Sequence, residues 1–255
     1  MSFEYVIEDN IVVFKFNNGK VNAVSTETLK GLDEVIQRVN KEEELKGIVI
    51  TGEGRYLSGG FDLNTFTSFK NGAEIIEWFE YEEKVLLDLF TCTKPVVAAI
   101  NGHATAAGMI ISMACDYCIA VNHPKIKVGM TEIKIGLALT PAEMEIMRFG
   151  LDTNKNMKDV IFKGELIGVE EAFERGIFDE LAEDAADAVE KAKAKVSALI
   201  DTPGRPFILL KEFQKQHAAQ DIIDGLEKYD WDKLVETFTD EQVVGTLKMV
   251  LKSIS

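Results

Sequence analysis

Two segments of the chain combine small residues with a position directly after an apolar run. Residues 52–63 read Gly-Glu-Gly-Arg-Tyr-Leu-Ser-Gly-Gly-Phe-Asp-Leu, and residues 101–110 read Asn-Gly-His-Ala-Thr-Ala-Ala-Gly-Met-Ile. Small side chains let a ligand atom approach the main chain, and the first N–H groups of a helix have no intrahelical partner. We therefore expect the second segment, where a helix begins, to suit a developing oxyanion. A surface turn and a tightly packed helix are the plain structural alternatives for the two segments.

A third segment, residues 127–137, places Glu132 just after a short apolar run and among apolar neighbours. A carboxylate there could be desolvated, which would raise its pKa toward that of a general base. The alternative is an ordinary solvated glutamate. Glu143 is a possible second carboxylate, and its alternative is a solvated side chain favoured by the dipole at a helix start.

Other chemical motifs are absent or incomplete. Leu57 stands where a dinucleotide-binding loop would have its third glycine, and no phosphate-binding Gly-Lys-Ser/Thr sequence occurs. The three histidines, His103, His123 and His217, are not spaced as metal ligands. No Gly-x-Ser-x-Gly sequence is present, which argues against a serine hydrolase. We therefore expect no metal site.

The pair Cys115-x-x-Cys118 has the spacing of redox and zinc motifs, but it lies inside an apolar block. Cys92 is the one further cysteine, so no second pair completes a four-ligand site. We expect buried structural thiols and no disulfide framework. A reducing cytoplasm is then the simplest compartment.

The charge balance of the 255 residues is strongly acidic, with 28 Lys and Arg against 43 Asp and Glu and a net charge of -15. This balance disfavours binding to nucleic acid or to an anionic membrane surface. The N-terminal sequence is acidic and lacks the features of a signal peptide. The most apolar stretch, residues 95–121, is interrupted by polar residues such as Asn101 and Asp116, so we expect a buried core there instead of a membrane span.

Hydrophobic periodicity predicts the elements that must position these segments. A β-hairpin is expected over residues 3–16, and Ser25 is expected to cap a following helix. Further strands are predicted at 47–51, 96–100, 117–121 and 127–130. One helix is predicted at 73–90, and another follows the small-residue segment 104–107 and extends through residue 114. From residue 141 onward the pattern is helical, including 180–200 and 207–251.

The repeated unit of strand, loop and helix indicates an α/β fold followed by helices. We expect residues 1–200 to form the core that carries the site. Residues 201–255 are expected to form a helical region that serves in oligomer contacts or as a lid.

In this order and combination, the segments resemble those of the crotonase, or enoyl-CoA hydratase/isomerase, superfamily. The resemblance extends over the whole chain and is best over residues 11–180. Five motifs carry it: Val-Asn-Ala-Val-Ser at 21–25, Leu-Ser-Gly-Gly-Phe-Asp-Leu at 57–63, Lys-Pro-Val-Val-Ala-Ala-Ile-Asn-Gly at 94–102, Cys-Asp at 115–116, and Glu-Ile-Lys-Ile-Gly-Leu at 132–137.

The resemblance implies a crotonase-like spiral of ββα units with a C-terminal helical subdomain, assembled as a homotrimer or a dimer of trimers. It implies a coenzyme A thioester as substrate and no resident cofactor. It assigns the two oxyanion donors to the backbone N–H groups of Phe61 and Ala107. It also implies these substrate contacts: Val21, Ala23, Gly60, Asp62, Leu63, Ile110 and, near the C-terminus, Met249 and Lys252.

The same resemblance bears on the reaction. Hydratases of the superfamily use two glutamates, whose positions correspond here to Ile110 and Glu132. A single glutamate opposite an apolar residue is similar to the Δ3,Δ2-enoyl-CoA isomerases. This implies that Glu132 moves a proton from C2 to C4 of a 3-enoyl-CoA while the two N–H groups hold the enolate. The alternatives are a hydratase acting on 2-enoyl-CoA, another acyl-CoA reaction, or a non-catalytic relative that binds acyl-CoA.

Overall fold

Two β-sheets form the centre of the computed structural model, which describes residues 2–254. The larger sheet has the strand order β1 (Phe3–Glu8), β2 (Ile11–Phe16), β3 (Gly47–Gly52), β5 (Val96–Ile100), β7 (Tyr117–Val121) and β10 (Glu180–Ala182). The smaller sheet has the order β4 (Tyr56–Ser58), β6 (His103–Thr105), β8 (Lys127–Gly129) and β9 (Ile167–Gly168).

The large sheet begins with the predicted hairpin and continues as parallel strands. β1 and β2 are antiparallel, and Asp9 and Asn10 form their turn with positive φ angles of 52° and 64°. From β2 onward, each strand runs parallel to its neighbour. Every residue of β3 and β5 is buried, as expected of strands that lie between layers of helices. The structure therefore confirms the α/β class.

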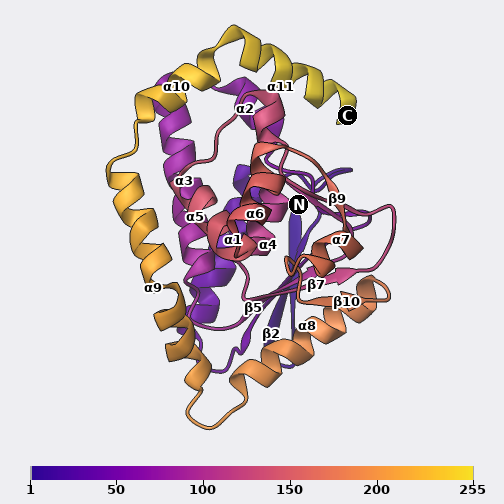
Figure 1. Cartoon of the computed structure of the whole chain (residues 1–255). Helices are drawn as coiled ribbons and strands as arrows, with labels where there is room; N and C mark the ends of the chain where they lie inside the picture. The colour runs from indigo at the N-terminus through magenta and orange to yellow at the C-terminus, as the bar shows by residue number, and fades with distance from the viewer. Residues whose placement is uncertain (1, 255) are drawn as a thin grey trace.

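Helices pack against the two sheets (Figure 1). They are α1 (Thr26–Lys41), α2 (Leu63–Ser68), α3 (Gly72–Phe90), α4 (Ala107–Ala114), η1 (Glu132–Ile135), α5 (Pro141–Leu151), α6 (Asn154–Met157), η2 (Lys158–Phe162), α7 (Val169–Glu174), α8 (Ala185–Ile200), α9 (Pro206–Glu227), α10 (Trp231–Thr239) and α11 (Glu241–Ile254).

Local sequence explains the ends of these helices. The side chain of Ser25 accepts a hydrogen bond from the N–H of Thr28 at 3.3 Å, which confirms the predicted cap of α1. α8 packs on β3, β5 and β7, while α1 packs on α3 and on β2. Because the central strands β3 and β5 are fully buried, the loops at their carboxyl ends remain free to form a site.

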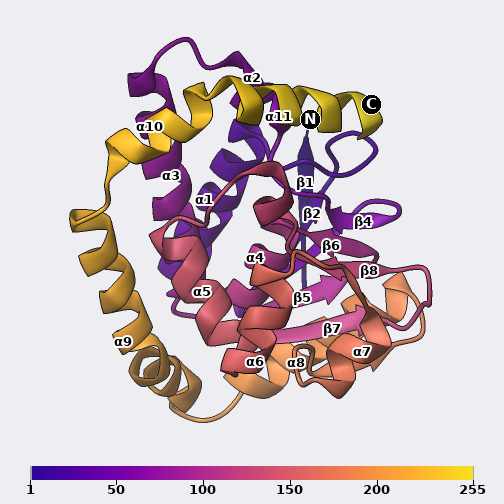
Figure 2. The ribbon, with the colours of Figure 1, turned by 45° about the horizontal axis from the view of Figure 1, so that its top comes forward.

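The last three helices run along one side of the molecule and then across one end (Figures 1 and 2). α9 packs on α5, α10 on α3, and α11 on α2. A buried ion triad fastens α9 to the core: Asp116 accepts hydrogen bonds from Lys211 at 2.6 Å and Lys215 at 2.8 Å. Lys215 also donates to the carbonyls of Phe90 and Ala114, so its buried ammonium is fully engaged.

Two expectations about elements were wrong in detail. Residues 180–182 are a strand paired with β7, not the start of the helix predicted over 180–200, which begins at Ala185. No strand was predicted at residues 56–58 or 103–105, but these residues form strands β4 and β6, which pair with each other. Within residues 2–254, no helix combines the length and apolarity needed to cross a bilayer.

Candidate active site

The N–H of Phe61 is directed by a short stretch of parallel pairing. Val24 forms an isolated bridge with Phe61: its N–H donates to Gly60 O at 2.9 Å, and its carbonyl accepts from Asp62 N at 3.0 Å. Because successive peptide groups of an extended chain alternate in direction, the N–H of Phe61 points away from Val24. It is therefore free of the bridge and available to a ligand on the other side.

The N–H of Ala107 belongs to the first turn of α4, where helical N–H groups have no intrahelical partner. The residue before it, Ala106, has φ 54° and ψ -125°, a conformation that costs a non-glycine residue of order 1–3 kcal/mol. The Ala106 N–H donates to Gly129 O at 3.0 Å, and its carbonyl accepts from Met109 and Ile110. These hydrogen bonds stabilise the positive-φ conformation of Ala106 at the start of the helix.

Two glycines allow the two N–H segments to approach each other. Gly60 has φ +127°, and a Cβ there would lie 3.0 Å from the Cβ of Ala106. A Cβ on Gly108 would lie 2.4 Å from the carbonyl oxygen of Ser58, closer than any side chain tolerates. Larger residues would separate the segments, so the small residues bring the two donors to one place.

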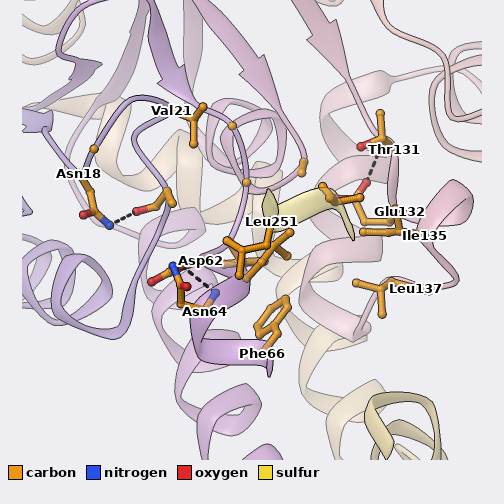
Figure 3. A pocket seen from close by; sticks show the side chains of 18 of the residues that line it. Asn18, Val21, Asp62, Asn64, Phe66, Thr131, Glu132, Ile135, Leu137 and Leu251 are labelled. Atoms are coloured by element: carbon orange, nitrogen blue, oxygen red, sulfur yellow. Dashed lines mark hydrogen bonds between the residues drawn. The ribbon is translucent and has the colours of Figure 1, made fainter. Parts of the chain in front are cut away.

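Glu132 follows β8 and opens the short helix η1. Its Oε2 accepts a hydrogen bond from the N–H of Thr131 at 2.7 Å (Figure 3). Burial raises the pKa of Glu132 to about 7, although the backbone donors act in the opposite direction. At neutral pH the side chain can therefore both accept and release a proton, as a general acid–base group requires.

Glu132, Phe61 and Ala106 line a cavity of about 420 Å³, whereas the predicted donor residue Ala107, next to Ala106, is buried and is not among the lining residues. Six residues assigned by resemblance line it besides Glu132: Val21, Ala23, Gly60, Phe61, Asp62 and Leu63. The cavity is polar at one edge, where Asn18, the exposed Lys20 and Asn64 lie. Another part of the lining is apolar, so the cavity has two chemically different ends.

The apolar end is built from aromatic and aliphatic side chains of distant segments. The ring of Phe66 lies 5.5 Å from that of Phe79 and 5.1 Å from that of Phe238. Leu137 and Leu251 also line this cavity, and Figure 3 shows the side chain of Leu251, from α11, between Asp62 and Glu132. An acyl chain would find its hydrophobic surroundings here.

Three further carboxyl groups lie behind the apolar end. Glu143 lines the cavity and is 5% exposed, and burial and the nearby Glu83 raise its pKa to about 8. Glu83 accepts hydrogen bonds from Thr140 Oγ1 at 2.5 Å and Ala142 N at 2.8 Å. Glu82 is fully buried, its carboxylate oxygens lack a hydrogen-bond partner, and burial raises its pKa well above the ordinary range.

Four other residues singled out from the sequence do not lie where they were expected. Glu143 does stand at a helix start, in a capping box with Thr140, but the expectation that solvent surrounds it was wrong because it is buried. Ile110 is fully buried in α4 and is not among the residues that line the cavity. Met249 and Lys252 are exposed on α11, whereas their neighbours Val250 and Leu251 line the cavity.

Sequence reasoning missed Glu82 and Glu83 and the aromatic end of the cavity. The two glutamates stand within the α3 pattern as ordinary charged residues, and only tertiary packing buries them. Cys115 and Cys118 are buried, and their thiols lie 3.2 and 3.1 Å from the carbonyls of Ile111 and Ser112, as expected of structural cysteines. Among residues 2–254, no three His, Cys, Asp or Glu side chains gather as a metal-ligand set.

Most of the chain matches a known family and known proteins. Residues 6–249 match the enoyl-CoA hydratase/isomerase family. Over 246 residues, the chain is 30% identical to a probable enoyl-CoA hydratase of Bacillus subtilis (strain 168), covering 96% of this chain and 94% of that protein. It is 24% identical to the mitochondrial enoyl-CoA delta isomerase 1 of Mus musculus over 246 residues, covering 96% and 83%.

Solved structures show the same fold. The crystal structure of human mitochondrial delta3-delta2-enoyl-CoA isomerase superposes with a TM-score of 0.90 at 20% identity and covers 100% of this chain and 98% of that one. An enoyl-CoA hydratase/isomerase from Mycobacterium paratuberculosis superposes with a TM-score of 0.86 at 19% identity, covering 97% and 98%. The predicted fold class, with its C-terminal helices, is thereby confirmed.

Proposed function

Because the chain belongs to the enoyl-CoA hydratase/isomerase family, we propose that it shifts the double bond of a 3-enoyl-CoA to the 2-position. The carboxylate of Glu132 removes a proton from C2, and the electrons move onto the thioester oxygen. The N–H groups of Phe61 and Ala107 hold the resulting dienolate. Delivery of a proton to C4 then gives the 2-enoyl product. In its minimal form, protonated Glu132 makes that delivery itself.

The observation that carries this proposal is a carboxyl with a pKa of about 7 in the same cavity as the oxyanion segments. Stabilisation by preorganised N–H donors is large in such sites, where the loss of one donor costs about 2.7–4 kcal/mol. The residue that follows the oxyanion turn at the second-carboxylate position is Ile110, which has no proton to give. A proton shift needs no activated water, so the apolar residue favours isomerisation.

The polarity of the cavity supports a coenzyme A thioester as the substrate, with no resident cofactor. The exposed Lys20 supplies positive charge at the polar edge, where the anionic coenzyme would lie on an otherwise acidic protein. The acyl chain would extend toward Phe66 and Phe238. The buried, unpaired thiols and acidic surface are consistent with our proposal of a cytoplasmic location.

The test uses purified protein with cis- and trans-3-enoyl-CoA and with 2-enoyl-CoA of the same chain length. Isomerisation of the 3-enoyl substrate is expected to exceed hydration of the 2-enoyl substrate. A Glu132→Gln variant should lose isomerisation, and a Glu236→Gln variant, changed on the outer part of α10, is the matched control. Fast hydration without isomerisation would refute the proposal.

The second candidate is hydration of a 2-enoyl-CoA. Two observations favour it: the chain is 30% identical to a probable enoyl-CoA hydratase, and a second carboxyl, Glu143, lines the cavity. Two carboxyls could position and activate a water molecule between them. The same assay distinguishes the candidates, because hydration produces a 3-hydroxyacyl-CoA whereas isomerisation leaves the mass of the substrate unchanged.

We also propose that the chain assembles as a homotrimer or a dimer of trimers. Helix α9 exposes large apolar side chains, with Leu210 64% and Phe213 56% exposed, more than a monomer's solvated helix usually shows. Light scattering coupled to size-exclusion chromatography is expected to give three or six times the chain mass. A monomer at micromolar concentration would contradict this assembly.

A further inference from the structure

Two carboxyl groups, not one, border the space in which the acyl chain would lie. Glu132 and Glu143 line the same cavity, and the charge of Glu132 contributes to the raised pKa of Glu143. They approach from different elements. Glu132 opens η1 just after Gly129, whose carbonyl accepts the N–H of Ala106 at the oxyanion turn. Glu143 stands at the start of α5, which packs on α3, the helix that carries Phe79 of the apolar end. The cavity therefore has a carboxyl near the thioester end and another toward the acyl end.

The position of Glu143 is fixed by its helix. Its Oε2 accepts a hydrogen bond from Thr140 N at 2.8 Å, and Thr140 accepts one from the N–H of Glu143 in return. Such a reciprocal cap leaves little rotational freedom to the side chain. Glu143 is 5% exposed and lines the cavity, so its small exposed surface is directed toward a bound ligand.

The groups around Glu143 keep a proton on it. On α3, Glu83 accepts two hydrogen bonds, from Thr140 and Ala142, which counteract the rise in its pKa that burial causes. Burial, the charge of Glu83 and the charge of Glu132 raise the pKa of Glu143, to about 8. The remaining neighbours are Glu82 and Tyr229, both of which interact electrostatically with Glu143, and neither brings a positive charge.

Glu132 and Glu143 therefore stand in different surroundings. A pair of carboxyls whose surroundings separate their pKa values divides into a base and an acid. Glu132 accepts a backbone hydrogen bond from Thr131 in the cavity that the oxyanion segments line, which suits the base. Glu143 lies against the carboxyls of Glu82 and Glu83, which favours the protonated acid.

We infer that Glu143 is a second catalytic residue, the carboxylic acid that protonates C4 of the dienolate. This inference rests on the proposed isomerase function. The carboxylate of Glu132 takes the proton from C2, and the electron pair of that C–H bond enters the dienolate. The electrons then form the bond from C4 to the proton of Glu143, which becomes a carboxylate. After product release, water in the open cavity carries the proton from Glu132 back to Glu143.

An isotope experiment separates this scheme from one in which Glu132 makes both transfers. A 3-enoyl-CoA deuterated at C2 is converted in ordinary water in a single turnover, and the product is examined by mass spectrometry and NMR. If one glutamate works alone, the deuterium removed from C2 reappears at C4. If Glu143 is the acid, C4 of the wild-type product carries ordinary hydrogen.

The variant Glu143→Gln tests the same step without removing the helix cap, because glutamine also serves at this position of a capping box. We expect its isomerisation rate to fall by about 10²-fold or more, in keeping with the usual contribution of a positioned acid. The remaining turnover should now carry deuterium from C2 to C4 through Glu132. Glu82→Gln is the matched control, since Glu82 is buried beside Glu143 but does not line the cavity.

The control should keep the wild-type rate within about twofold and the wild-type labelling. The inference is overturned if Glu143→Gln is as fast as wild type, if the wild-type product carries the C2 deuterium at C4, or if Glu82→Gln slows the reaction equally. Absence of isomerisation in the wild-type enzyme would instead refute the proposed function. Thermal unfolding of each variant distinguishes a lost proton donor from a lost fold.

Discussion

Replacing Glu132 by glutamine should abolish isomerisation and at the same time stabilise the protein. Burial raises the pKa of Glu132 from 4.5 to about 7, so the folded state opposes its ionisation. Because a tenfold change in proton affinity corresponds to about 1.4 kcal/mol, full ionisation costs the folded state about 3 kcal/mol relative to the unfolded chain. Between pH 4.5 and 7 the folded state binds more protons than the unfolded chain, and stability falls as the pH rises.

The glutamine variant lacks this cost, since it carries no charge at any pH. Urea unfolding should therefore show the variant to be more stable by about 2–3 kcal/mol at pH 8.5 and by less than about 1 kcal/mol at pH 5. Its isomerase activity should fall by about 10²–10⁴-fold. Equal stability of the two proteins at both pH values would show that Glu132 is well solvated. An unchanged activity would show that another group is the base.

Three other outcomes are expected. The kcat/KM of isomerisation should rise with pH around 7 as Glu132 ionises, and fall above about 8 as Glu143 loses its proton. In the Glu143→Gln variant, the fall above about pH 8 should be absent. A flat profile from about pH 5.5 to about 8.5 in the wild-type protein would contradict both assignments. Gly108→Ala should lower the melting temperature and the catalytic rate, because its Cβ would meet the carbonyl of Ser58 at 2.4 Å and cost about 1–3 kcal/mol. Asp116→Asn should destabilise the fold by about 3–5 kcal/mol in urea titrations, since two buried lysines would lose their counter-charge; a loss below 1 kcal/mol would show that water reaches them.

Local sequence patterns were sufficient to predict the helices and strands that are long or that begin at a clear capping residue. The hairpin at 3–16 and the cap at Ser25 follow from alternation and from one side chain, and both are present. Strands β4 and β6 could not be found in this way, because a strand of three residues is too short to show a periodic pattern. They exist through pairings such as Tyr56 with His103, which join segments far apart in the chain.

The candidate site, too, could be predicted from the sequence only in part. Glu132 could be predicted because its segment is contiguous and its neighbours are apolar. The carboxyl groups around Glu143, which raise its pKa, could not be predicted, because they come together only where α3 packs against the start of α5. The apolar end of the cavity combines Phe66 with Phe238 and Leu251, and no local pattern relates residues so distant in the sequence.

The dependence of the cavity on α11 also determines when a newly made chain can first hold its ligand. Glu132 leaves the ribosome well before Val250 and Leu251, which complete the cavity wall. At about 5–20 residues per second, that interval is roughly 6–24 s. During it, the sheets can form while the acyl end of the cavity is still open to solvent and to chaperones. A ligand can therefore contact the complete cavity wall only after synthesis has passed α11.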